Sequence, residues 1–318
     1  MSESDKVQVN CDSGKIPPVN RILQPMEPLQ TFSKTRIAPT PSGFLHLGNV
    51  FSFALTAGLA ARMNAAVLLR IDDLDQERAN EVFVQDIFDT LHFLNIPFSE
   101  GPQDYPAYKN TWSQLHRLPL YQQALEELKP HVFACDCSRT QIARAGKDGV
   151  YPGTCRDKNI PLDTPGVAWR LRTAHDATLR VRTLEGPVIE TALPAQMKDF
   201  VVRKKDGFPA YQLASVVDDE HFGVDGIIRG EDLWPSTLAQ IYLSTLLPGC
   251  RFGEKVFHHH PLLLETGDLK MSKSAGSTSV QFLRKSGKAP HEIFSAIGAM
   301  MGIAAPVRDY LELTDAVL

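Results

Sequence analysis

The sequence has no hydrophobic run long enough to cross a membrane. A membrane-spanning helix needs about 20 predominantly apolar residues, and the most apolar long stretch, residues 51–69, is interrupted by Arg62 and Asn64. The N-terminal residues MSESDKVQVNCDSGK lack the apolar core of a signal peptide. These absences predict a cytoplasmic protein with no membrane partner, and they assign residues 51–69 to a buried helix followed by a strand.

Cysteine is also scarce, at 5 among 318 residues. An odd count in a reducing compartment argues against a disulfide framework. Three of the five, Cys135, Cys137 and Cys155, nevertheless lie within 21 residues. Thiolates this close in sequence can converge on one tetrahedral ion, and three thiolates favour zinc. The cluster therefore predicts a zinc site, with three unligated cysteines as the alternative.

A strong net charge is missing too, because 33 Lys and Arg against 37 Asp and Glu leave −4. The charge of the whole chain therefore predicts no polyanionic partner. Residues 131–205 differ, with 13 Lys and Arg against 8 Asp and Glu. This basic segment is compatible with a docking surface for a phosphate backbone, and equally with an ordinary solvated surface.

What the sequence does contain is an alternation of strand and helix patterns. The mostly apolar run at residues 66–71 is typical of a strand covered on both faces, and the apolar spacing over residues 80–94 is helical. Strands that alternate with helices predict a doubly wound parallel α/β sheet. The other expected strands are 35–38, 167–172, 179–183, 226–229 and 256–264, and the other expected helices are 48–63, 118–128, 211–217, 233–247 and 289–300.

The segment RIAPTPSGFLHLGN, residues 36–49, predicts a phosphate site at a helix N-terminus. A strand ends here, prolines and glycines shape a tight turn, and a helix begins near Gly48. Backbone N–H groups, His46 and Asn49 would then lie at the positive end of the helix, where a triphosphate can bind. Gly48 would let an adenine or a ribose approach the backbone closely. The alternative is a connection that only caps the helix.

A second motif, KMSKS at residues 270–274, is followed closely by a glycine. Its lysines, Lys270 and Lys273, and its hydroxyl groups suit a mobile clamp on phosphates, because lysine acts there as a point charge. The alternative is a charged loop without a function.

Together the two motifs resemble the signatures of the class I aminoacyl-tRNA synthetases. HLGN at residues 46–49 looks like their HIGH motif, and residues 270–274 are their KMSKS motif. The resemblance narrows to the glutamyl branch, because LRIDDLD, YQLASVVDD and IRGEDL look like later motifs of that branch and occur in the right order. It implies a Rossmann-like doubly wound sheet with an inserted zinc-bearing α/β module and a short helical C-terminal segment.

The cysteine cluster narrows the resemblance further. Cys135, Cys137, Tyr151 and Cys155 are spaced like the zinc ligands of the glutamyl-queuosine tRNA(Asp) synthetases. Only 44 residues follow Ser274, so we expect no large anticodon-binding domain of the kind that full-length glutamyl enzymes carry. The resemblance implies that the chain activates L-glutamate with ATP and transfers it to queuosine in the anticodon loop of tRNA(Asp), a single-stranded target of a kind that proteins bind.

The resemblance also implies cofactors and site residues. The zinc would be structural, and Mg²⁺ would accompany ATP. Asp72 stands where the family has Glu to hold the substrate ammonium group, so a bridging water or a backbone shift would be needed. The implied catalytic residues are His46, Asn49 and Lys273, with Gly48 and Lys270 also binding ATP. The implied glutamate site is Arg36, Ala38, Thr40, Asp72, Tyr211 and Arg229, of which Arg229 would pair with the side-chain carboxylate.

Two other functions fit the sequence, and it identifies no protein partner and no oligomeric state. One is a truncated glutamyl- or glutaminyl-tRNA synthetase that relies on a partner for anticodon recognition, and the other is an adenylating paralogue that aminoacylates a non-tRNA acceptor. The implied division of the chain is an N-terminal extension without assigned function (1–34), the first half of the catalytic domain (35–134), an inserted zinc-bearing acceptor-type module (135–205), the second half of the catalytic domain (206–265), and the KMSKS loop with C-terminal helices (266–318).

Overall fold

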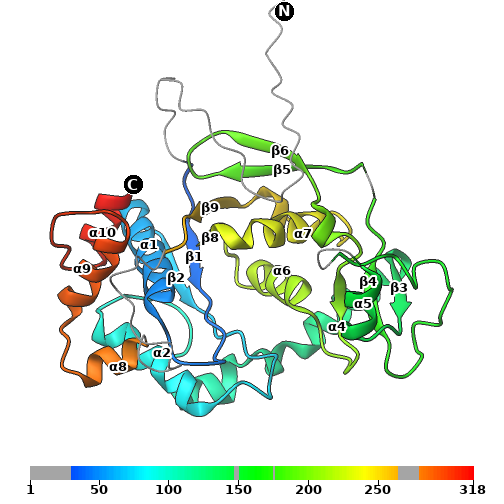
Figure 1. The fold of residues 1–318 in the computed structure, drawn as a ribbon, viewed down its shortest axis with the longest axis horizontal. Coiled ribbons are helices and arrows are strands. Elements are labelled where there is room, and N and C mark those ends of the chain that lie inside the picture. Colours follow the sequence, from blue (N-terminus) through cyan, green and yellow to red (C-terminus); the bar gives the residue numbers. More distant parts are fainter. Residues whose placement is uncertain (1–29, 147–149, 175, 264–278) are drawn as a thin grey trace, which may run out of the picture. The chain divides into compact units, whose positions relative to one another are not determined.

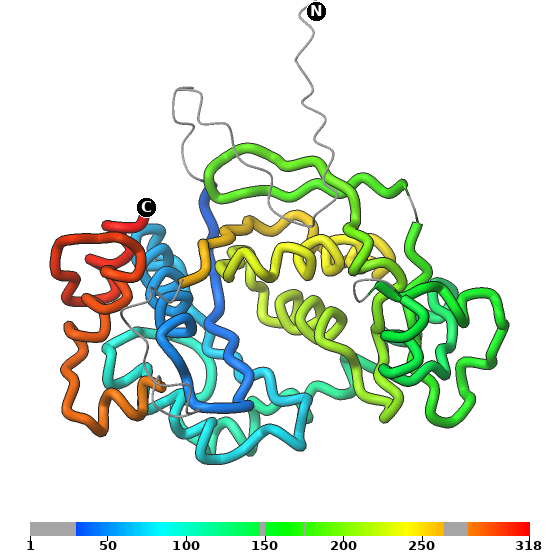
Figure 2. The backbone as a smooth tube through the Cα atoms, in the orientation of Figure 1, coloured from blue at the N-terminus to red at the C-terminus, as the bar shows by residue number. Residues whose placement is uncertain are grey.

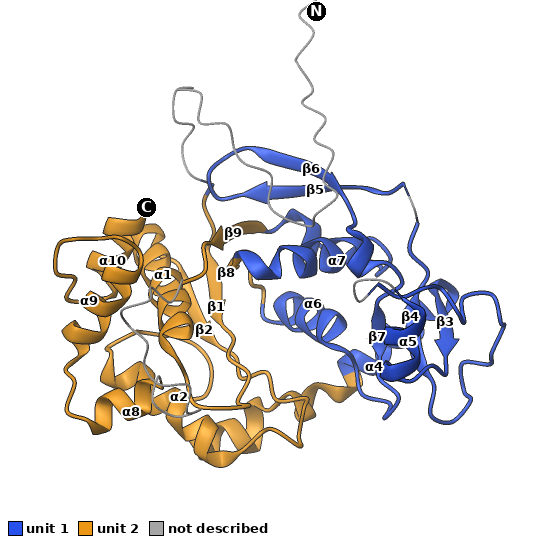
Figure 3. Cartoon of the chain, in the orientation of Figure 1, with its two compact units in different colours: residues 1–30, 120–222, 231–255 blue, residues 31–119, 223–230, 256–318 orange. Residues whose placement is uncertain are grey.

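The structure is a computed structural model whose described residues are 30–146, 150–174, 176–263 and 279–318. Its contacts divide the chain into two compact units, which Figure 3 shows in different colours. The backbone passes more than once from one unit to the other, and Figure 2 lets the reader follow its path. Of the described residues, the first unit holds 30, 120–146, 150–174, 176–222 and 231–255, and the second unit holds 31–119, 223–230, 256–263 and 279–318.

Parallel strands form the centre of the second unit (Figure 1). The Asp225 N–H donates to Lys34 O at 3.0 Å, so that β1 lies beside β8. Nearly every side chain on these strands is buried, as parallel strands covered on both faces require. This arrangement agrees with the predicted parallel sheet. β1 (Lys34–Ile37) pairs with β2 (Ala66–Leu69), and β8 (Gly226–Gly230) pairs with β9 (Val256–His260).

Helices surround these strands within the second unit. The longest is α1 (Leu47–Met63), which ends at Asn64 in the left-handed conformation that asparagine tolerates. α10 (Tyr310–Val317) packs so closely on α1 that a Cβ atom at Gly58 would lie 2.0 Å from Thr314 Oγ1. The remaining helices are α2 (Glu81–Phe93), α3 (Tyr105–Ala107), α8 (Val280–Lys285) and α9 (Pro290–Met300), with a π-helical turn at Tyr108–Trp112 and a 3₁₀ turn at Gln114–Arg117.

The first unit combines helices with antiparallel strands. β5 alternates exposed and buried residues, as a strand with one solvated face does. The segment predicted as an inserted module, residues 135–205, belongs entirely to this unit, and its boundaries stay a prediction. One antiparallel sheet has the strand order β3 (Val132–Cys135), β4 (Ala168–Leu171), β7 (Val201–Arg203). A second antiparallel pair is formed by β5 (Thr178–Thr183) and β6 (Val188–Ala192). The helices are α4 (Leu118–Leu128), α5 (Arg139–Ala145), α6 (Tyr211–His221) and α7 (Trp234–Ser244).

Most predicted elements form close to their expected bounds, and the differences have local causes. The strand predicted over residues 256–264 ends at His260, because Pro261 has no N–H to donate to a ladder. The helix predicted over residues 211–217 continues to His221. The sequence analysis missed the short elements α3, α5, α8, α10, β3, β6 and β7. Among the described residues, no helix is both long and apolar enough to cross a membrane.

Candidate functional site

Five of the six residues implied for glutamate lie on or just beyond parallel strands of the second unit. The pairing of β1 with β2 continues past both strands, because the Arg70 N–H donates to Ile37 O at 2.9 Å. The Asp72 N–H likewise donates to Pro39 O at 2.9 Å. Asp72 is therefore held beside the segment that carries Ala38, at the carboxyl end of the strands, where ligands bind in open α/β sheets. Arg36 lies in β1, Ala38 and Thr40 follow β1, Asp72 follows β2, and Arg229 lies in β8.

Two buried arginines lie on neighbouring strands of this group. Arg36 and Arg229 are 6% and 4% exposed, and Arg36 Nη1 donates to Ile228 O at 3.3 Å. The guanidinium carbon of Arg229 lies 5.7 Å from the ring centroid of Phe257. Guanidinium groups on adjacent strands produce a positive potential, which suits the binding of a substrate carboxylate.

His259, the middle one of three consecutive histidines on β9, lies in the same positive environment. His259 is paired in register with Arg229. Burial first, and then the charge of Arg229, hold the pKa of His259 well below its usual range, so its ring is neutral at neutral pH. The His260 ring packs edge-on against Phe51, with centroids 4.9 Å apart. Among the described residues, the only cluster of metal-ligating side chains involves cysteines, not these histidines.

The carboxylate of Asp72 is paired with an arginine of its own segment. Arg70 Nε donates to Oδ1 at 2.7 Å, and Arg70 Nη2 donates to Oδ2 at 3.1 Å. The side chains are 2% exposed for Arg70 and 12% exposed for Asp72. The sequence analysis missed this partner, although residues i and i+2 of an extended segment share a face. The bidentate pair fixes the orientation of the shortened carboxylate and offsets its charge.

The turn before α1 carries the residues that the sequence predicts to bind phosphate. His46 is the N-cap of α1, and its N–H donates to Asn49 Oδ1 at 3.0 Å. A Cβ atom at Gly48 would lie 3.1 Å from two atoms of the His46 ring, so glycine makes room for the imidazole. Burial lowers the pKa of His46, which keeps its ring neutral at neutral pH. A neutral imidazole beside helix N–H groups can donate a hydrogen bond to a phosphate oxygen.

The structure does not test three of the predicted site residues. Lys270 and Lys273 lie outside the described residues, which resume at Ser279. Ser279 forms a β-bridge with His46. Tyr211 begins α6 in the first unit and is 45% exposed. The roles of these two lysines and of Tyr211 stay predictions.

The three clustered cysteines converge in the first unit, around the end of β3. The sulfur atoms of Cys135, Cys137 and Cys155 all lie within 4.8 Å of one another. The hydroxyl of Tyr151 lies 3.5 Å from Cys135 Sγ and accepts the N–H of Cys155 at 2.9 Å. The structure therefore gathers the three cysteines that the spacing indicated, together with the tyrosine that the resemblance implied.

The surroundings of this cluster suit a bound cation. Burial raises the pKa of Cys135, but hydrogen bonds from Tyr151, the Cys137 N–H and Arg170 together outweigh burial and lower it. Burial raises the pKa of Cys137 to about 12 and also raises that of Tyr151. A metal ion would displace these protons on binding. Three sulfur atoms and one phenol oxygen form a donor set that fits zinc.

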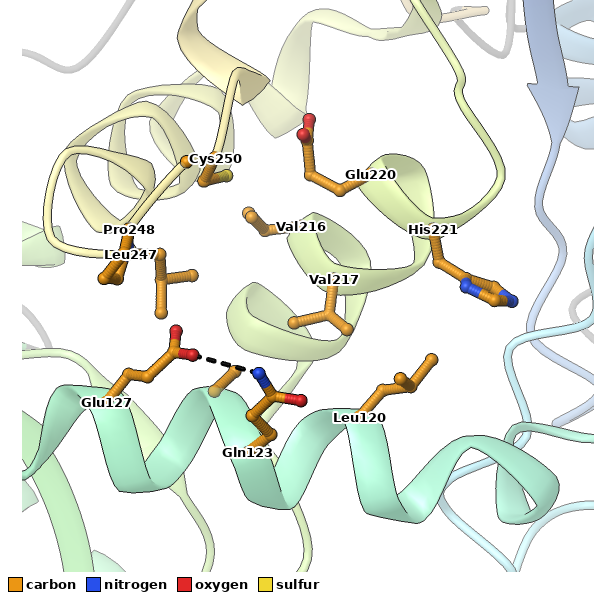
Figure 4. A pocket seen from close by; sticks show the side chains of 12 residues that line it. Leu120, Gln123, Glu127, Val216, Val217, Glu220, His221, Leu247, Pro248 and Cys250 are labelled. Atoms are coloured by element: carbon orange, nitrogen blue, oxygen red, sulfur yellow. Dashed lines mark hydrogen bonds between the residues drawn. The ribbon is translucent and has the colours of Figure 1, made fainter.

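A separate pocket of about 340 Å³ lies in the first unit between α4, α6 and the segment after α7 (Figure 4). Gln123 and Glu127 of α4 project toward it, and Gln123 Nε2 donates to Glu127 Oε1 at 3.2 Å. Val216 and Val217 of α6 give it an apolar wall. None of the residues predicted to bind ATP, glutamate or zinc lines this pocket, so it is distinct from the candidate site.

Comparison with known proteins identifies a family. The family described as "tRNA synthetases class I (E and Q), catalytic domain" matches residues 33–312. "Glutamyl-Q tRNA(Asp) synthetase" of Rhodobacter capsulatus is 34% identical over 83% of this chain and 99% of that protein. The protein of the same name from Nocardia farcinica is 33% identical over 87% of each chain. "Glutamate--tRNA ligase 2" of Nitrosococcus oceani is 33% identical over 83% of this chain and 58% of that protein.

Solved structures agree on the fold. The crystal structure of glutamate-tRNA synthetase from Elizabethkingia anophelis gives a TM-score of 0.69 at 22% identity, covering 89% of this chain and 65% of that one. A glutamate tRNA ligase from Elizabethkingia meningosepticum, in complex with its amino acid, also gives 0.69, at 21% identity over 89% of this chain and 64% of that one. The predicted Rossmann-like fold is thereby confirmed.

Proposed function

We propose a function for this chain, which belongs to the class I tRNA synthetases for glutamate and glutamine. It activates L-glutamate with ATP and transfers the glutamyl group to queuosine in the anticodon of tRNA(Asp). It is a ligase of the aminoacyl-tRNA synthetase type. Sequence identity does not separate queuosine from the terminal ribose as the acceptor, because relatives with either name are 32% to 34% identical to this chain.

One observation carries the choice of acceptor. Cys135, Cys137 and Cys155 gather around the hydroxyl of Tyr151, and this set resembles the zinc ligands of the glutamyl-queuosine enzymes. The similarity to the Rhodobacter capsulatus protein, which extends over 99% of its length, supports the same choice. These residues would hold a zinc ion that stabilises the end of β3 and the loops that follow it.

The first step joins glutamate to ATP. The α-carboxylate of glutamate attacks the α-phosphorus, and pyrophosphate leaves with the electron pair of the broken P–O bond. His46 and Asn49 would hold phosphate oxygens at the N-terminus of α1, with Gly48 allowing close approach. Lys270 and Lys273 would neutralise the developing charge, and Mg²⁺ would be bound by the phosphates of ATP. Catalysis of this kind depends on positioning and on charge stabilisation.

The amino-acid site selects glutamate by charge. Arg229 would form a bidentate pair with the substrate side-chain carboxylate, and a neutral amide would not satisfy both guanidinium donors equally. Asp72 would hold the substrate ammonium group while Arg70 fixes its carboxylate from the other side. Arg36, Ala38, Thr40 and Tyr211 would complete the walls of the site.

The second step transfers the activated acyl group. A hydroxyl of queuosine attacks the carbonyl carbon of glutamyl-adenylate, its proton is lost to solvent, and AMP leaves as an ester forms. The acceptor is a base in a single-stranded loop, which can be splayed out of its stack. The basic segment at residues 131–205 would contribute positive charge to the docking of the tRNA backbone.

The test is a transfer assay with ATP, labelled glutamate and tRNA prepared with and without queuosine. We expect label only on queuosine-containing tRNA(Asp), and mapping should place the ester on the queuosine ring. Glutamate-dependent exchange of pyrophosphate into ATP reports the first step alone.

A second function is favoured by the similarity to the Nitrosococcus oceani ligase. A chain of that kind would place the ester on the terminal ribose of tRNA, and this result would reject the queuosine proposal. Pyrophosphate exchange without any labelled tRNA would instead indicate an adenylating enzyme with a non-tRNA acceptor.

A further inference from the structure

A buried carboxylate holds the backbone immediately before His46. Asp86 of α2 is 1% exposed, and its Oδ2 accepts the Leu45 N–H at 3.0 Å. Leu45 itself is buried and directly precedes the N-cap of α1. No sequence motif pointed to Asp86, which looks like an ordinary polar position on a helix.

The other side of Leu45 is held as well. The Val280 N–H, at the start of α8, donates to Leu45 O at 2.8 Å. Ser279 forms a β-bridge with His46. The peptide groups on both sides of Leu45 are thus fixed, and their orientation determines where the chain enters α1 and where the His46 ring lies.

Burying this carboxylate carries a free-energy cost that the fold only partly offsets. Within the described part of the chain, the other oxygen, Oδ1, is buried and accepts no hydrogen bond. Burial raises the pKa of Asp86, against the lowering effects of the Leu45 N–H, Arg284 and Lys285, while Asp89 raises it further. A neutral side chain would cost less to bury, but a charged acceptor forms a stronger hydrogen bond to a backbone N–H.

We propose that Asp86 is a positioning residue for ATP binding, which fixes the His46 turn by holding Leu45 against α8. Asp86 does not touch ATP, and acts through the backbone that presents His46 and Asn49. The inference rests on the proposed role of these two residues in binding phosphate. It is independent of the acceptor of the glutamyl group.

The test compares Asp86→Asn, Asp86→Leu and the control Asp89→Asn by binding of ATP with Mg²⁺ and by glutamate-dependent pyrophosphate exchange. Asp86→Leu removes the acceptor and should weaken ATP binding about 10- to 100-fold. Asp86→Asn keeps a neutral acceptor of the same shape and should weaken it about fivefold. Both variants should leave the KM for glutamate unchanged.

The control lies one helical turn away and separates positioning from packing. Asp89 pairs with Arg284 of α8 at 3.0 Å but forms no bond to Leu45, so Asp89→Asn should keep the wild-type affinity for ATP. Wild-type ATP affinity in Asp86→Asn, or equal effects on ATP and glutamate, would overturn the proposal, even if Asp86→Leu does not fold. A wild-type chain that does not bind ATP would overturn it together with the proposed function. A chain that binds ATP and glutamate but labels no queuosine loses only the proposed acceptor.

Discussion

The cysteine cluster and the strand-end group around Arg36 and Arg229 are built in opposite ways. The cysteines lie within 21 residues of sequence, and one strand end with two loops brings them together. Arg36, in contrast, hydrogen-bonds to a residue 192 positions away, through the neighbouring strand β8. The first site depends on local spacing, whereas the second depends on the order of strands in a sheet.

The two sites also differ in how their polar groups are satisfied. In the strand-end group, Asp72 is paired with Arg70 and is supported by a backbone ladder. In the cysteine cluster, three thiols and one phenol face one another, with Cys137 Sγ and Cys155 Sγ 3.3 Å apart, although Asp136 Oδ1 also accepts from Cys155 Sγ at 3.1 Å. We therefore expect the cluster to depend on a metal for its stability, and the strand-end group to keep its shape without ligand.

The largest expected effect is the loss of metal from the cluster. Cys137→Ser should lower zinc content from about one ion per chain to nearly none, because it removes one of four ligands. The melting temperature should fall strongly, since structural zinc contributes about 10–16 kcal/mol in small zinc-binding peptides. Zinc analysis and thermal unfolding measure both effects. Cys250→Ser, outside the cluster, is the matched control, and a zinc-free wild-type chain would contradict the prediction.

A smaller effect is expected at the strand ends, where binding should suffer more than folding. Arg229→Ala should raise the KM for glutamate in pyrophosphate exchange about 10- to 100-fold, because charge-assisted hydrogen bonds contribute about 1.5–3 kcal/mol. The KM for ATP should not change. Arg229→Lys should recover only part of the lost affinity for glutamate, since lysine keeps the charge but lacks the paired N–H donors of a guanidinium group. An equal rise in the KM for glutamate and the KM for ATP would show that Arg229 supports the fold instead.

The pairing of Asp72 with Arg70 sets up a finer test. Asp72→Glu restores the missing methylene and should lower the KM for glutamate about threefold, a change of less than 1 kcal/mol. Asp72→Asn should raise it, because the ammonium group loses a charged acceptor. If Asp72→Glu raises the KM for glutamate, the aspartate is already placed correctly by Arg70, and the inference from its short side chain is wrong.

The last effect concerns folding stability and His259, beside Arg229. Its folded-state pKa lies well below the usual value, so below about pH 6.5 the unfolded chain binds a proton that the folded chain does not. Stability should therefore fall as the pH drops below about 6.5, by at most about 1.4 kcal/mol per pH unit. Urea unfolding should show that the free energy of unfolding falls less between pH 7 and pH 5.5 in His259→Gln than in wild type. His221→Gln, which changes an exposed histidine, should keep the wild-type difference.

Sequence patterns predicted the central elements well and the short ones poorly. The helix over residues 118–128 forms with the predicted bounds, because its apolar spacing is helical and its core side chains are buried. Short strands such as β7 and short helices such as α8 contain too few residues to show a period, and tertiary contacts decide them. The same limit explains why Asp86 and Arg70 escaped notice, since each acts through a backbone or side-chain partner and not through a motif.

By itself the sequence determined the family and predicted the ATP-binding motifs and the metal-ligand set, because these features reside in residue types at short, regular spacings. Only the tertiary structure decided that Arg36 lies beside β8, that Arg70 neutralises Asp72 and that Asp86 holds the turn before His46. Such contacts arise when strands and helices far apart in the chain pack together to bury their apolar faces. No local pattern specifies them, since a sheet or a helix pair forms them only once its neighbours are in place.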